Sequence, residues 1–494
     1  MTAAPRAEVA ARARTALQRG GLSRPVRLAL EDGLISPGAT AVFDYGCGRG
    51  GDIARLSRAG VQCAGWDPHH RPNGALTPSD VVNLGFVVNV IEDAHERQTT
   101  LKRAWSLARS VLLVSARLTS ESRDLEGVPF RDGLRTSTGT FQKLYTQDEL
   151  RSWIDSTLGA RSAAAAPGVF FVFRHPALEQ EWLLRRVRRS QRLAPISREL
   201  LDQHEELLRP LMDFISERGR LPRALELDPS AGIEREFGTL RNAFAVVRRV
   251  TGTEPWDRVR DARSQDMLVF LALSRFGKRP RAMDLPDEIR YDVRDLFGSH
   301  AAACRQADRL LFAMADQHRV RAAAAASPAG KKMPTALYVH ADALGQLPPI
   351  LRVLDGAARH LIGDIEASTV VKLHLDRPAV SYLEYPDFDA VPHPALRSGY
   401  LVTLDRLRCD FRDYSRHANP PILHRKELLL APSDPRYARF AALTRQEQRA
   451  GLYEQPEAIG TQRTWQQLVD ARGLRYAGHR LLRTRPDLGP SNAE

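Results

Sequence analysis

Short apolar runs alternate with amphipathic segments through the first third of the chain. Strand-like runs lie at 41–44, 62–67, 80–90, 111–115 and 169–173, and helical segments lie at 52–60, 94–108 and 146–158. Strands that alternate with helices are typical of a parallel sheet with helices on its faces. We therefore predict an α/β domain over residues 1–178, in which the alanine-rich stretch 163–168 forms a turn before the last strand.

The rest of the chain has a different pattern. Residues 179–330 carry leucines at helical spacing among charged residues, which predicts a helical region. Residues 331–494 mix strand-like and helical segments, which predicts a C-terminal mixed α/β domain. The alanine-rich segment 321–332 has the composition of a linker or of a helix end, so we place the second domain boundary near residue 330.

Composition supports a folded protein of several domains. The 494 residues are 43% hydrophobic and 27% charged, which is the balance of a globular chain long enough for about three domains. No apolar run reaches the roughly 18 residues of a membrane span, and the arginine-containing N-terminus lacks the apolar core of a secretory signal. We therefore expect no membrane partner.

Cysteine and charge content restrict the compartment and the partners. Four cysteines without metal-ligand spacing predict a reducing, cytoplasmic environment and no metal site. The formal net charge of +13 favours a nucleic-acid partner. Only seven of the 72 basic residues are lysines, however, because an alanine–arginine bias runs through the whole chain. The charge alone is therefore weak support.

A glycine-rich loop after the first predicted strand carries the clearest functional signal. The strand ends in Asp44, and Gly46, Gly48 and Gly50 then allow a sharp turn and a close approach of the backbone to a ligand. The helix that follows directs its positive N-terminal end to the same place. The next strand ends at Asp67, whose carboxylate can accept hydrogen bonds from both hydroxyls of a ribose. A nucleoside ligand is therefore predicted, and a purely structural strand-to-helix turn is the alternative.

This arrangement resembles the class I S-adenosylmethionine-dependent methyltransferases. Asp44, Gly46, Gly48 and Gly50 match the first motif of that family, and Asp67 matches its ribose-binding acid. The acid-first D-x-G-x-G spacing differs from the G-x-G-x-x-G fingerprint of dinucleotide oxidoreductases. The resemblance implies a Rossmann-like class I methyltransferase sheet and S-adenosylmethionine as the cofactor.

The chain departs from that family in one connection. Only residues 68–79 separate the second predicted strand from the third, which leaves no room for the usual helix, strand and adenine-binding acid. We therefore expect a sheet that lacks one strand, with the adenine contact supplied by the 76–80 loop or by another segment. His69 and His70 follow the ribose acid and either contact the adenine or contact nothing.

Motifs that would name the methylated atom are absent from the third strand. This strand carries neither D-P-P-Y nor N-P-P-Y, and it lacks the nucleophilic Pro-Cys of the cytosine C5 enzymes. The N-P-P-I sequence at 419–422 lies in another domain and lacks the aromatic residue that stacks on a flipped base. We interpret it as a rigid turn.

Six segments also resemble the family of DNA phosphorothioation-associated methyltransferases. They span all of the chain except its helical middle and lie at 43–52, 83–93, 139–143, 335–340, 380–389 and 419–427. The resemblance implies an association with systems that replace a DNA phosphate oxygen with sulfur. DNA and other proteins of such a modification system are the partners that it implies.

Methyl transfer from a sulfonium is an in-line displacement, so an enzyme mainly positions the nucleophile and removes a proton where needed. Asn89 and Glu92, at the end of the third predicted strand, are the candidate catalytic residues. Glu92 could act as a base or orient the amine of the cofactor's methionine. Asp93 is better explained as the N-cap of the helix that follows.

The long loop at 119–145 mixes cations with aromatic residues. Arg131, Arg135 and Lys143 are candidate nucleic-acid contacts, together with Arg123, because cations and aromatic rings suit contacts to phosphates and bases. A solvated surface loop is the alternative.

Four histidines and two aspartates of the C-terminal domain could share one site: His340, His374, His393, His424, Asp387 and Asp389. Their spacing matches no metal-binding signature. Separate local contacts explain such residues with fewer assumptions, so we expect no metal there.

Together these patterns predict a cytoplasmic S-adenosylmethionine-dependent methyltransferase that acts on nucleic acid, and on DNA in particular. The first domain would hold the cofactor, and the remaining domains would recognise the substrate. One alternative is a non-catalytic methyltransferase-fold module that binds DNA or serves assembly. The other is a methyltransferase for RNA or for a small molecule.

Overall fold

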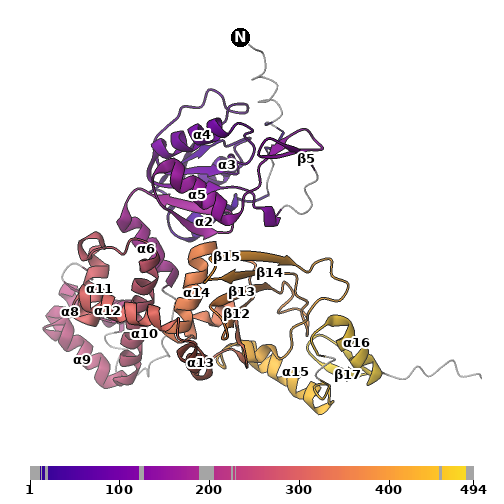
Figure 1. The fold of residues 1–494 in the computed structure, drawn as a ribbon. Coiled ribbons are helices and arrows are strands. Elements are labelled where there is room, and N and C mark those ends of the chain that lie inside the picture. Colours follow the sequence, from indigo (N-terminus) through magenta and orange to yellow (C-terminus); the bar gives the residue numbers. More distant parts are fainter. Residues whose placement is uncertain are drawn as a thin grey trace, which may run out of the picture. The chain divides into compact units, whose positions relative to one another are not determined.

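The computed structural model describes residues 12, 14–16, 20–121, 127–187, 205–223, 226–227, 230–455 and 459–484. The chain divides into two compact units, Met1–Phe312 and Ala313–Glu494, and Figure 1 labels part of their elements. The predicted boundaries near residues 178 and 330 stay predictions. No described helix is both long enough and apolar enough to cross a membrane.

A six-stranded sheet forms the centre of the first unit. Its strands are β1 (Ala41–Tyr45), β2 (Gln62–Trp66), β3 (Ser79–Gly85), β4 (Ala108–Ser115), β8 (Ser162–Ala166) and β9 (Val169–Phe173), in the order β2-β1-β3-β4-β9-β8. The first four strands pair in parallel, and β9 is antiparallel to both of its neighbours. The strand order reverses between β1 and β3, as in Rossmann-like folds.

The predicted loss of one strand is confirmed. β2 lies at an edge of the sheet, and the connection from Asp67 to Pro78 contains neither a helix nor a strand beyond an isolated bridge between Asp67 and Arg71. A connection this short cannot include the usual crossover helix and additional strand.

Helices cover both faces of this sheet. They are α2 (Arg24–Glu31), α3 (Gly51–Arg58), α4 (Ala94–Leu107), α5 (Gln147–Leu158) and α6 (Pro176–Val187). Neighbouring residues of one strand enter opposite cores, because side chains alternate along a strand. Leu112 of β4 packs in the core that includes α4 and α5, whereas Leu113 packs in the core that includes α2 and α6. Burial on both faces explains the continuous apolar runs of the sequence.

Two segments of the first unit differ from the sequence prediction. Residues 163–168, expected as a turn, contribute most of the fully buried β8, and the turn is limited to Pro167 and Gly168. Within the predicted loop at 119–145, β5 (Gly127–Phe130), β6 (Gly133–Thr136) and β7 (Phe141–Gln142) form a small antiparallel sheet. Both are cases in which pairing with a neighbouring strand overrides weak local strand preference.

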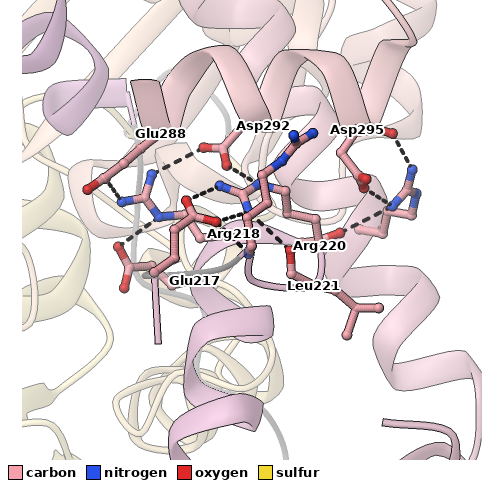
Figure 2. A network of polar contacts seen from close by, with 11 residues as sticks. Glu217, Arg218, Arg220, Leu221, Glu288, Asp292 and Asp295 are labelled. Atoms are coloured by element: carbon pink, nitrogen blue, oxygen red, sulfur yellow. Dashed lines mark hydrogen bonds and ion pairs between the residues drawn. The ribbon is translucent and has the colours of Figure 1, made fainter. Parts of the chain in front are cut away.

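The region after α6 is helical, as predicted. Its helices are α7 (Glu205–Arg218), α8 (Ser230–Phe237), α9 (Leu240–Thr251), α10 (Glu254–Leu273), α11 (Asp287–Phe297) and α12 (His300–Ala313). A buried ionic network joins the end of α7 to α11 (Figure 2). Nε of Arg220 donates to Asp292 at 2.7 Å, and both side chains are 1% exposed. Glu226 binds the same guanidinium at 2.7 Å, and Arg218 pairs with Asp292 at 3.3 Å.

The second unit is built on an antiparallel sheet. Its six strands follow one another in sequence order: β10 (Lys331–Met333), β11 (Ala336–His340), β12 (Val370–His374), β13 (Ala379–Glu384), β14 (Ser398–Thr403) and β15 (Arg408–Asp413). The accompanying elements are α13 (Gln317–Ala326), α14 (Pro349–Ile362), η5 (Lys426–Leu429), α15 (Tyr437–Arg449), α16 (Gln462–Ala471) and the hairpin β16 (Leu474–Tyr476) and β17 (Leu481–Arg483). The predicted mixed α/β character is confirmed.

Two layers cover the larger sheet of the second unit. α14 packs on one face, where the hydroxyl of Tyr382 donates to Asp355 at 3.0 Å. The core on the other face contains Val370, Phe388 and Phe440. The stretch 321–332, expected as a linker or helix end, supplies the end of α13 and the first residues of β10.

Candidate functional site

The glycine loop between β1 and α3 has the left-handed backbone that its composition predicts. Gly46, Gly48 and Gly50 have φ angles of 82°, 51° and 77°, which residues with a Cβ atom disfavour. A Cβ atom on Gly46 would lie 2.5 Å from Cγ2 of Val87. The amide of Gly46 donates to the carbonyl of Trp66 at 2.8 Å, which joins the loop to the end of β2.

The two acids of the motif have different surroundings. Asp44 is buried and accepts a hydrogen bond from Nδ2 of Asn83 at 2.8 Å. Asp67 accepts from three backbone amides, those of Gly48 at 3.0 Å, His69 at 2.9 Å and His70 at 2.8 Å. A carboxylate has about four acceptor positions, so Asp67 retains capacity for a ligand while its orientation is fixed beside the loop.

A cavity of about 600 Å³ lies at the carboxyl ends of β1, β2 and β3. Its lining comes from the glycine loop, the end of β2, the turn after β3, α4 and the N-terminal segment, and includes Asp44, Gly46, Gly48, Asp67, His69, His70, Phe86, Val87, Val90, Thr99, Thr100 and Arg103. Ligands of open α/β sheets bind at the point where the strand order reverses, and this cavity lies there. Of the five predicted cofactor-binding residues, Gly50 does not line the cavity; it is the N-cap of α3.

The apolar wall of the cavity begins with a strained residue. Phe86 has a φ angle of 59°, which is uncommon for a bulky side chain. Its amide donates to the carbonyl and to Oγ of Ser115, at 2.9 and 3.1 Å. Two hydrogen bonds to β4 therefore hold the turn that carries Phe86 and Val87 into the lining. Strain of this kind is concentrated at ligand sites.

The residues that line the cavity include one thiol, that of Cys47. Burial, with the nearby charges of Asp44 and Asp67, raises the pKa of Cys47 to about 12. The reactive thiolate is therefore scarce at neutral pH.

The candidate base Glu92 is engaged by the N-terminal segment. Arg12 donates to Glu92 through Nη2 at 2.7 Å and to Glu96 through Nη1 at 2.5 Å. Hydrogen bonds and the charges of both acids raise the pKa of Arg12 against the opposing effect of burial. Arg12 and Glu96 line the cavity, whereas Glu92 lies outside its lining.

The second catalytic candidate, Asn89, is also outside the lining. It is buried, and its Nδ2 donates to Gln142 of β7 at 2.9 Å. Asp93 accepts from the amide of Glu96 at 2.8 Å, which confirms the predicted N-cap of α4. The catalytic roles of Asn89 and Glu92 stay predictions.

The three predicted substrate contacts differ in how firmly the chain holds them. Arg131 and Arg135 are exposed on the β5–β6 hairpin, with their guanidinium carbons 5.5 and 4.2 Å from the ring centroid of Phe130. Lys143 is mostly buried and pairs with Glu149 at 2.9 Å and with Asp132 at 3.5 Å. The two arginines thus remain accessible to a ligand, while Lys143 is occupied within the chain. Arg123 lies outside the described residues.

The segment after Asp67 contributes to the cavity only through its first residues. His69 and His70 line the cavity, with their ring centroids 4.8 Å apart, whereas the 76–80 loop does not contribute to the lining. Nε2 of His70 is buried and has no hydrogen-bond partner among the described residues. Of the segments considered for an adenine contact, the one with His69 and His70 is therefore nearer to the cavity.

Several lining residues were not identified from the sequence. Arg12 lies far from the motifs in sequence, and no local pattern connects it to the cavity. Helix α4 did carry a signal, because Glu96, Thr99, Thr100 and Arg103 follow helical spacing and form one polar stripe.

In the second unit, two of the four predicted histidines lie together. The rings of His393 and His424 are 4.5 Å apart at their centroids. His374 instead bonds with Oγ of Ser381 at 3.0 Å through Nε2, and Nδ1 of His340 accepts from the amide of Asp342 at 3.2 Å. No group of three or more metal-ligating side chains occurs in the part of the chain that the structure describes.

Asp387 and Asp389 do not join these histidines in a possible metal site among the described residues. The carboxylate of Asp389 pairs with Arg436 at 3.6 Å. The carbonyl of Asp387 accepts from the amides of Ala390 and Val391 in a turn. Both aspartates thus have local roles.

Comparison with solved structures finds similarity to methyltransferases. No family model matches the chain, and no curated protein matches it. A Burkholderia thailandensis 1,6-didemethyltoxoflavin-N1-methyltransferase with bound S-adenosylhomocysteine is 15% identical over 33% of this chain and 77% of that chain, with a TM-score of 0.23. The amino pentose methyltransferase CalS10 from Micromonospora echinaspora, with bound S-adenosylmethionine, is 15% identical over 35% and 98%, with a TM-score of 0.24. The magnesium protoporphyrin IX methyltransferase ChlM from Synechocystis is 15% identical over 33% and 93%, with a TM-score of 0.23.

Proposed function

We propose that the first unit binds S-adenosylmethionine and transfers its methyl group to a nucleic acid, with DNA as the leading substrate. The observation that carries the cofactor assignment is the cavity at the reversal point of the sheet, bounded by the glycine loop and Asp67. A bare backbone, the positive end of α3 and a ribose acceptor meet there, which is the set of groups that a nucleoside ligand requires.

The cavity residues fit the chemical parts of this cofactor. Gly46 and Gly48 leave the backbone without side chains at the cavity wall, and Asp67 is fixed beside them to accept from a ribose. Phe86 and Val87 supply an apolar surface suited to a flat base. The volume of about 600 Å³ is in the usual range for a ligand of this size, roughly 300–1,000 Å³.

In this proposal, residues of the chain bind and orient the cofactor and accept a proton from the substrate. When bound, the cofactor supplies a methyl group on a positively charged sulfur, which a nucleophile displaces in line. Three backbone amides hold the carboxylate of Asp67, so its orientation is set before a ligand arrives. His69 and His70 line the same cavity, and an imidazole can accept the proton of a substrate nucleophile.

The β5–β6 hairpin supports the nucleic-acid part of the proposal. Arg131 and Arg135 are exposed, are packed near Phe130, and form no ion pair among the described residues. Val128 on the same hairpin is 72% exposed. Cations combined with an aromatic ring and an exposed apolar side chain suit the backbone and bases of a nucleic acid. The net charge of +13 agrees with this.

DNA is preferred as the substrate because six segments of the chain resemble the DNA phosphorothioation-associated methyltransferases. On that basis we place the protein in a cytoplasmic DNA modification system, with other proteins of that system as partners. RNA or a small molecule is the competing substrate class.

The cofactor assignment is tested by calorimetric titration with S-adenosylmethionine. We expect saturable binding by the wild type and at least about tenfold weaker binding by Asp67→Ala, because a hydrogen bond to a charged group contributes about 1.5–3 kcal/mol. Asp284→Ala, which removes a partly exposed acid of the helical region far from the glycine loop in sequence, is the matched control and should bind as the wild type does. Absence of saturable binding by the wild type would overturn the assignment.

The substrate class is tested by incubation with cofactor carrying a labelled methyl group. We expect label in DNA, and Arg131→Gln with Arg135→Gln should reduce its incorporation without weakening cofactor binding. Label in RNA or in a small molecule, with none in DNA, would contradict the DNA assignment.

A second candidate function is a non-catalytic module that binds DNA. The observation that favours it is that Asn89 and Glu92 both lie outside the cavity lining, and each is already engaged by another side chain of the chain. If the protein is a module of this kind, the wild type and Asp67→Ala should bind DNA equally well, and neither should transfer the labelled methyl group. Loss of labelled product in Asp67→Ala would exclude it.

A further inference from the structure

Two consecutive helices of the helical region are joined by a very short turn. Only Gly238 and Thr239 separate α8 from α9, and the two helices pack against each other (Figure 1). Gly238 has a φ angle of 77°, which permits a sharp change of chain direction that residues with a Cβ atom disfavour. Oγ1 of Thr239 accepts from the amide of Asn242 at 3.1 Å, and Nδ2 of Asn242 donates to the carbonyl of Phe237 at 3.2 Å. The start of α9 is therefore fixed relative to the end of α8.

Helix α7 completes a three-helix core with this pair. The core combines buried apolar side chains of all three helices: Leu208, Leu211 and Ile215 of α7, Ile233 of α8, and Ala243 and Val247 of α9. A helix pair with a short turn that contains glycine is the arrangement of helix-turn-helix proteins, in which the second helix enters the major groove of DNA. The same arrangement occurs in helical bundles without a nucleic-acid partner, so the surface of α9 decides between the two roles.

The face of α9 that points away from this core carries two arginines around an alanine. Ala243 and Val247 are buried, whereas Arg241, Ala245 and Arg249 are exposed. These three residues are spaced four apart and therefore share one face of the helix. Because Ala245 has only a methyl group, the backbone of α9 can approach a partner closely between the two arginines.

The charge of α9 suits a polyanion. The helix contains three arginines and no acidic residue, and the acids of the pair are confined to α8. Arg248 pairs with Asp257 at 3.3 Å, whereas Arg241 and Arg249 form no ion pair within the described ranges of the chain. The positive N-terminal end of α9 lies next to Arg241 and adds to its attraction for phosphate groups.

The dimensions of this face match a groove of duplex DNA. Arg241 and Arg249 are eight residues apart, which corresponds to about 12 Å along a helix. The major groove is also about 12 Å wide and admits one α-helix. Val246 lies beside this face and is 37% exposed, and an apolar side chain there can contact the methyl group of thymine.

We propose that α9 is the recognition helix of a helix-turn-helix element and enters the major groove of duplex DNA through Arg241, Ala245 and Arg249. The forked donors of a guanidinium match either two phosphate oxygens or the O6 and N7 acceptors of guanine. This role rests on DNA being the partner in the proposed function, and it adds a DNA-binding element that takes no part in methyl transfer.

The full-length protein is tested by fluorescence anisotropy with a labelled DNA duplex of mixed sequence and with one of its single strands. We expect the wild type to bind the duplex more tightly, because a single strand has no major groove. Arg241→Gln and Arg249→Gln should each weaken duplex binding at least about fivefold. Arg305→Gln removes an exposed arginine of α12 and is the matched control, which should bind as the wild type does. A slope of log K against log salt that falls by about 1 identifies a phosphate contact, and an unchanged slope identifies a base contact.

Ala245→Glu separates binding from folding. Glutamate is a good helix former and Ala245 is exposed, so this variant should keep the thermal midpoint of the wild type. A carboxylate at the centre of the face should repel the phosphates and weaken duplex binding at least about tenfold. Ala301→Glu, at an exposed position of α12, is the matched control and should bind the duplex as the wild type does.

Three outcomes would overturn the assignment of α9. They are a wild type that does not bind the duplex, equal binding of duplex and single strand, and α9 variants that bind as their α12 controls do. If DNA is methylated while the α9 variants bind the duplex normally, the methyl-transfer proposal stands and the role of α9 falls. If the wild type binds no S-adenosylmethionine but the α9 variants lose duplex binding, the role of α9 stands and the methyl-transfer proposal falls.

Discussion

Gly46 and Gly139 share a backbone conformation but differ in what surrounds them. Their φ angles are 82° and 78°, so a Cβ atom would strain both positions. At Gly46 the added atom would also lie 2.5 Å from Val87, whereas at Gly139 nothing lies within 4 Å. The conformational requirement at Gly46 is readable from the motif. The contact with Val87 is not, because it depends on a turn from another strand.

Gly46→Ala should lower the free energy of unfolding by about 2–4 kcal/mol, since left-handed strain adds to overpacking. Gly139→Ala should lower it by about 1–2 kcal/mol, because only the strain applies. Urea denaturation measures both values. Adding Val87→Ala to Gly46→Ala should recover the difference, and equal losses in the two single variants would contradict the contact.

At the scale of the element, sequence patterns were sufficient where an element is specified locally. The capping box at Thr146 and Glu149 is present at the start of α5, and the short connection after Asp67 correctly indicated a missing strand. The prediction of a turn at 163–168 was wrong. Alanine has a weak strand preference, and the strand conformation of β8 comes from pairing with β9. Motif residues of the site were predictable for the same local reason. Phe86 and Arg12 were not, because contacts between segments far apart in the sequence place them: Phe86 donates to Ser115 of β4, and Arg12 pairs with Glu92 and Glu96.

The network that joins α7 to α11 supports a prediction about stability. Asp292→Ala would leave the buried guanidinium of Arg220 without one of its two acids (Figure 2). Breaking a buried pair from one side costs about 3–5 kcal/mol, so the free energy of unfolding measured in urea should fall by about that amount and the midpoint should move to lower urea concentration. Asp284→Ala breaks an exposed pair with Arg281 and is the control, with little expected change. A similar midpoint for both variants would argue against the network.

At the scale of the whole molecule, buried histidines make the second unit sensitive to acid. In the second unit, burial lowers the pKa of His374 to about 4, assisted by the charges of Lys372 and Arg377. Burial likewise lowers the pKa of His479 to about 4. Below the ordinary pKa of about 6.5, the unfolded chain binds protons that the folded unit excludes. Stability of the second unit is therefore complete above pH 6.5 and is lost as the pH falls towards 4.

His374→Asn should flatten this pH dependence. The wild type should lose as much as about 3 kcal/mol through His374 alone between pH 6.5 and 4, given a shift of about 2.5 in pKa. Urea unfolding at pH 7.5, 6 and 5, followed by far-ultraviolet circular dichroism, gives the stability at each pH. An unchanged slope in the variant would mean that His374 titrates normally. His318→Asn, which alters an exposed histidine of α13, should keep the slope of the wild type.

The bare side of β2 bears on how this protein behaves in concentrated solution. β2 is five residues long, and its outer side pairs with no strand among the described residues, so amide and carbonyl groups there can template pairing with another copy. The chain that follows shields the end of this edge, because Nε1 of Trp66 donates to the carbonyl of Pro72 at 3.2 Å and Gly74 packs closely against the carbonyl of Gly65. Substitutions at residues 72–74 that remove this shielding should thus first cause concentration-dependent self-association. The cavity beside the glycine loop should keep its ability to bind a ligand in such variants.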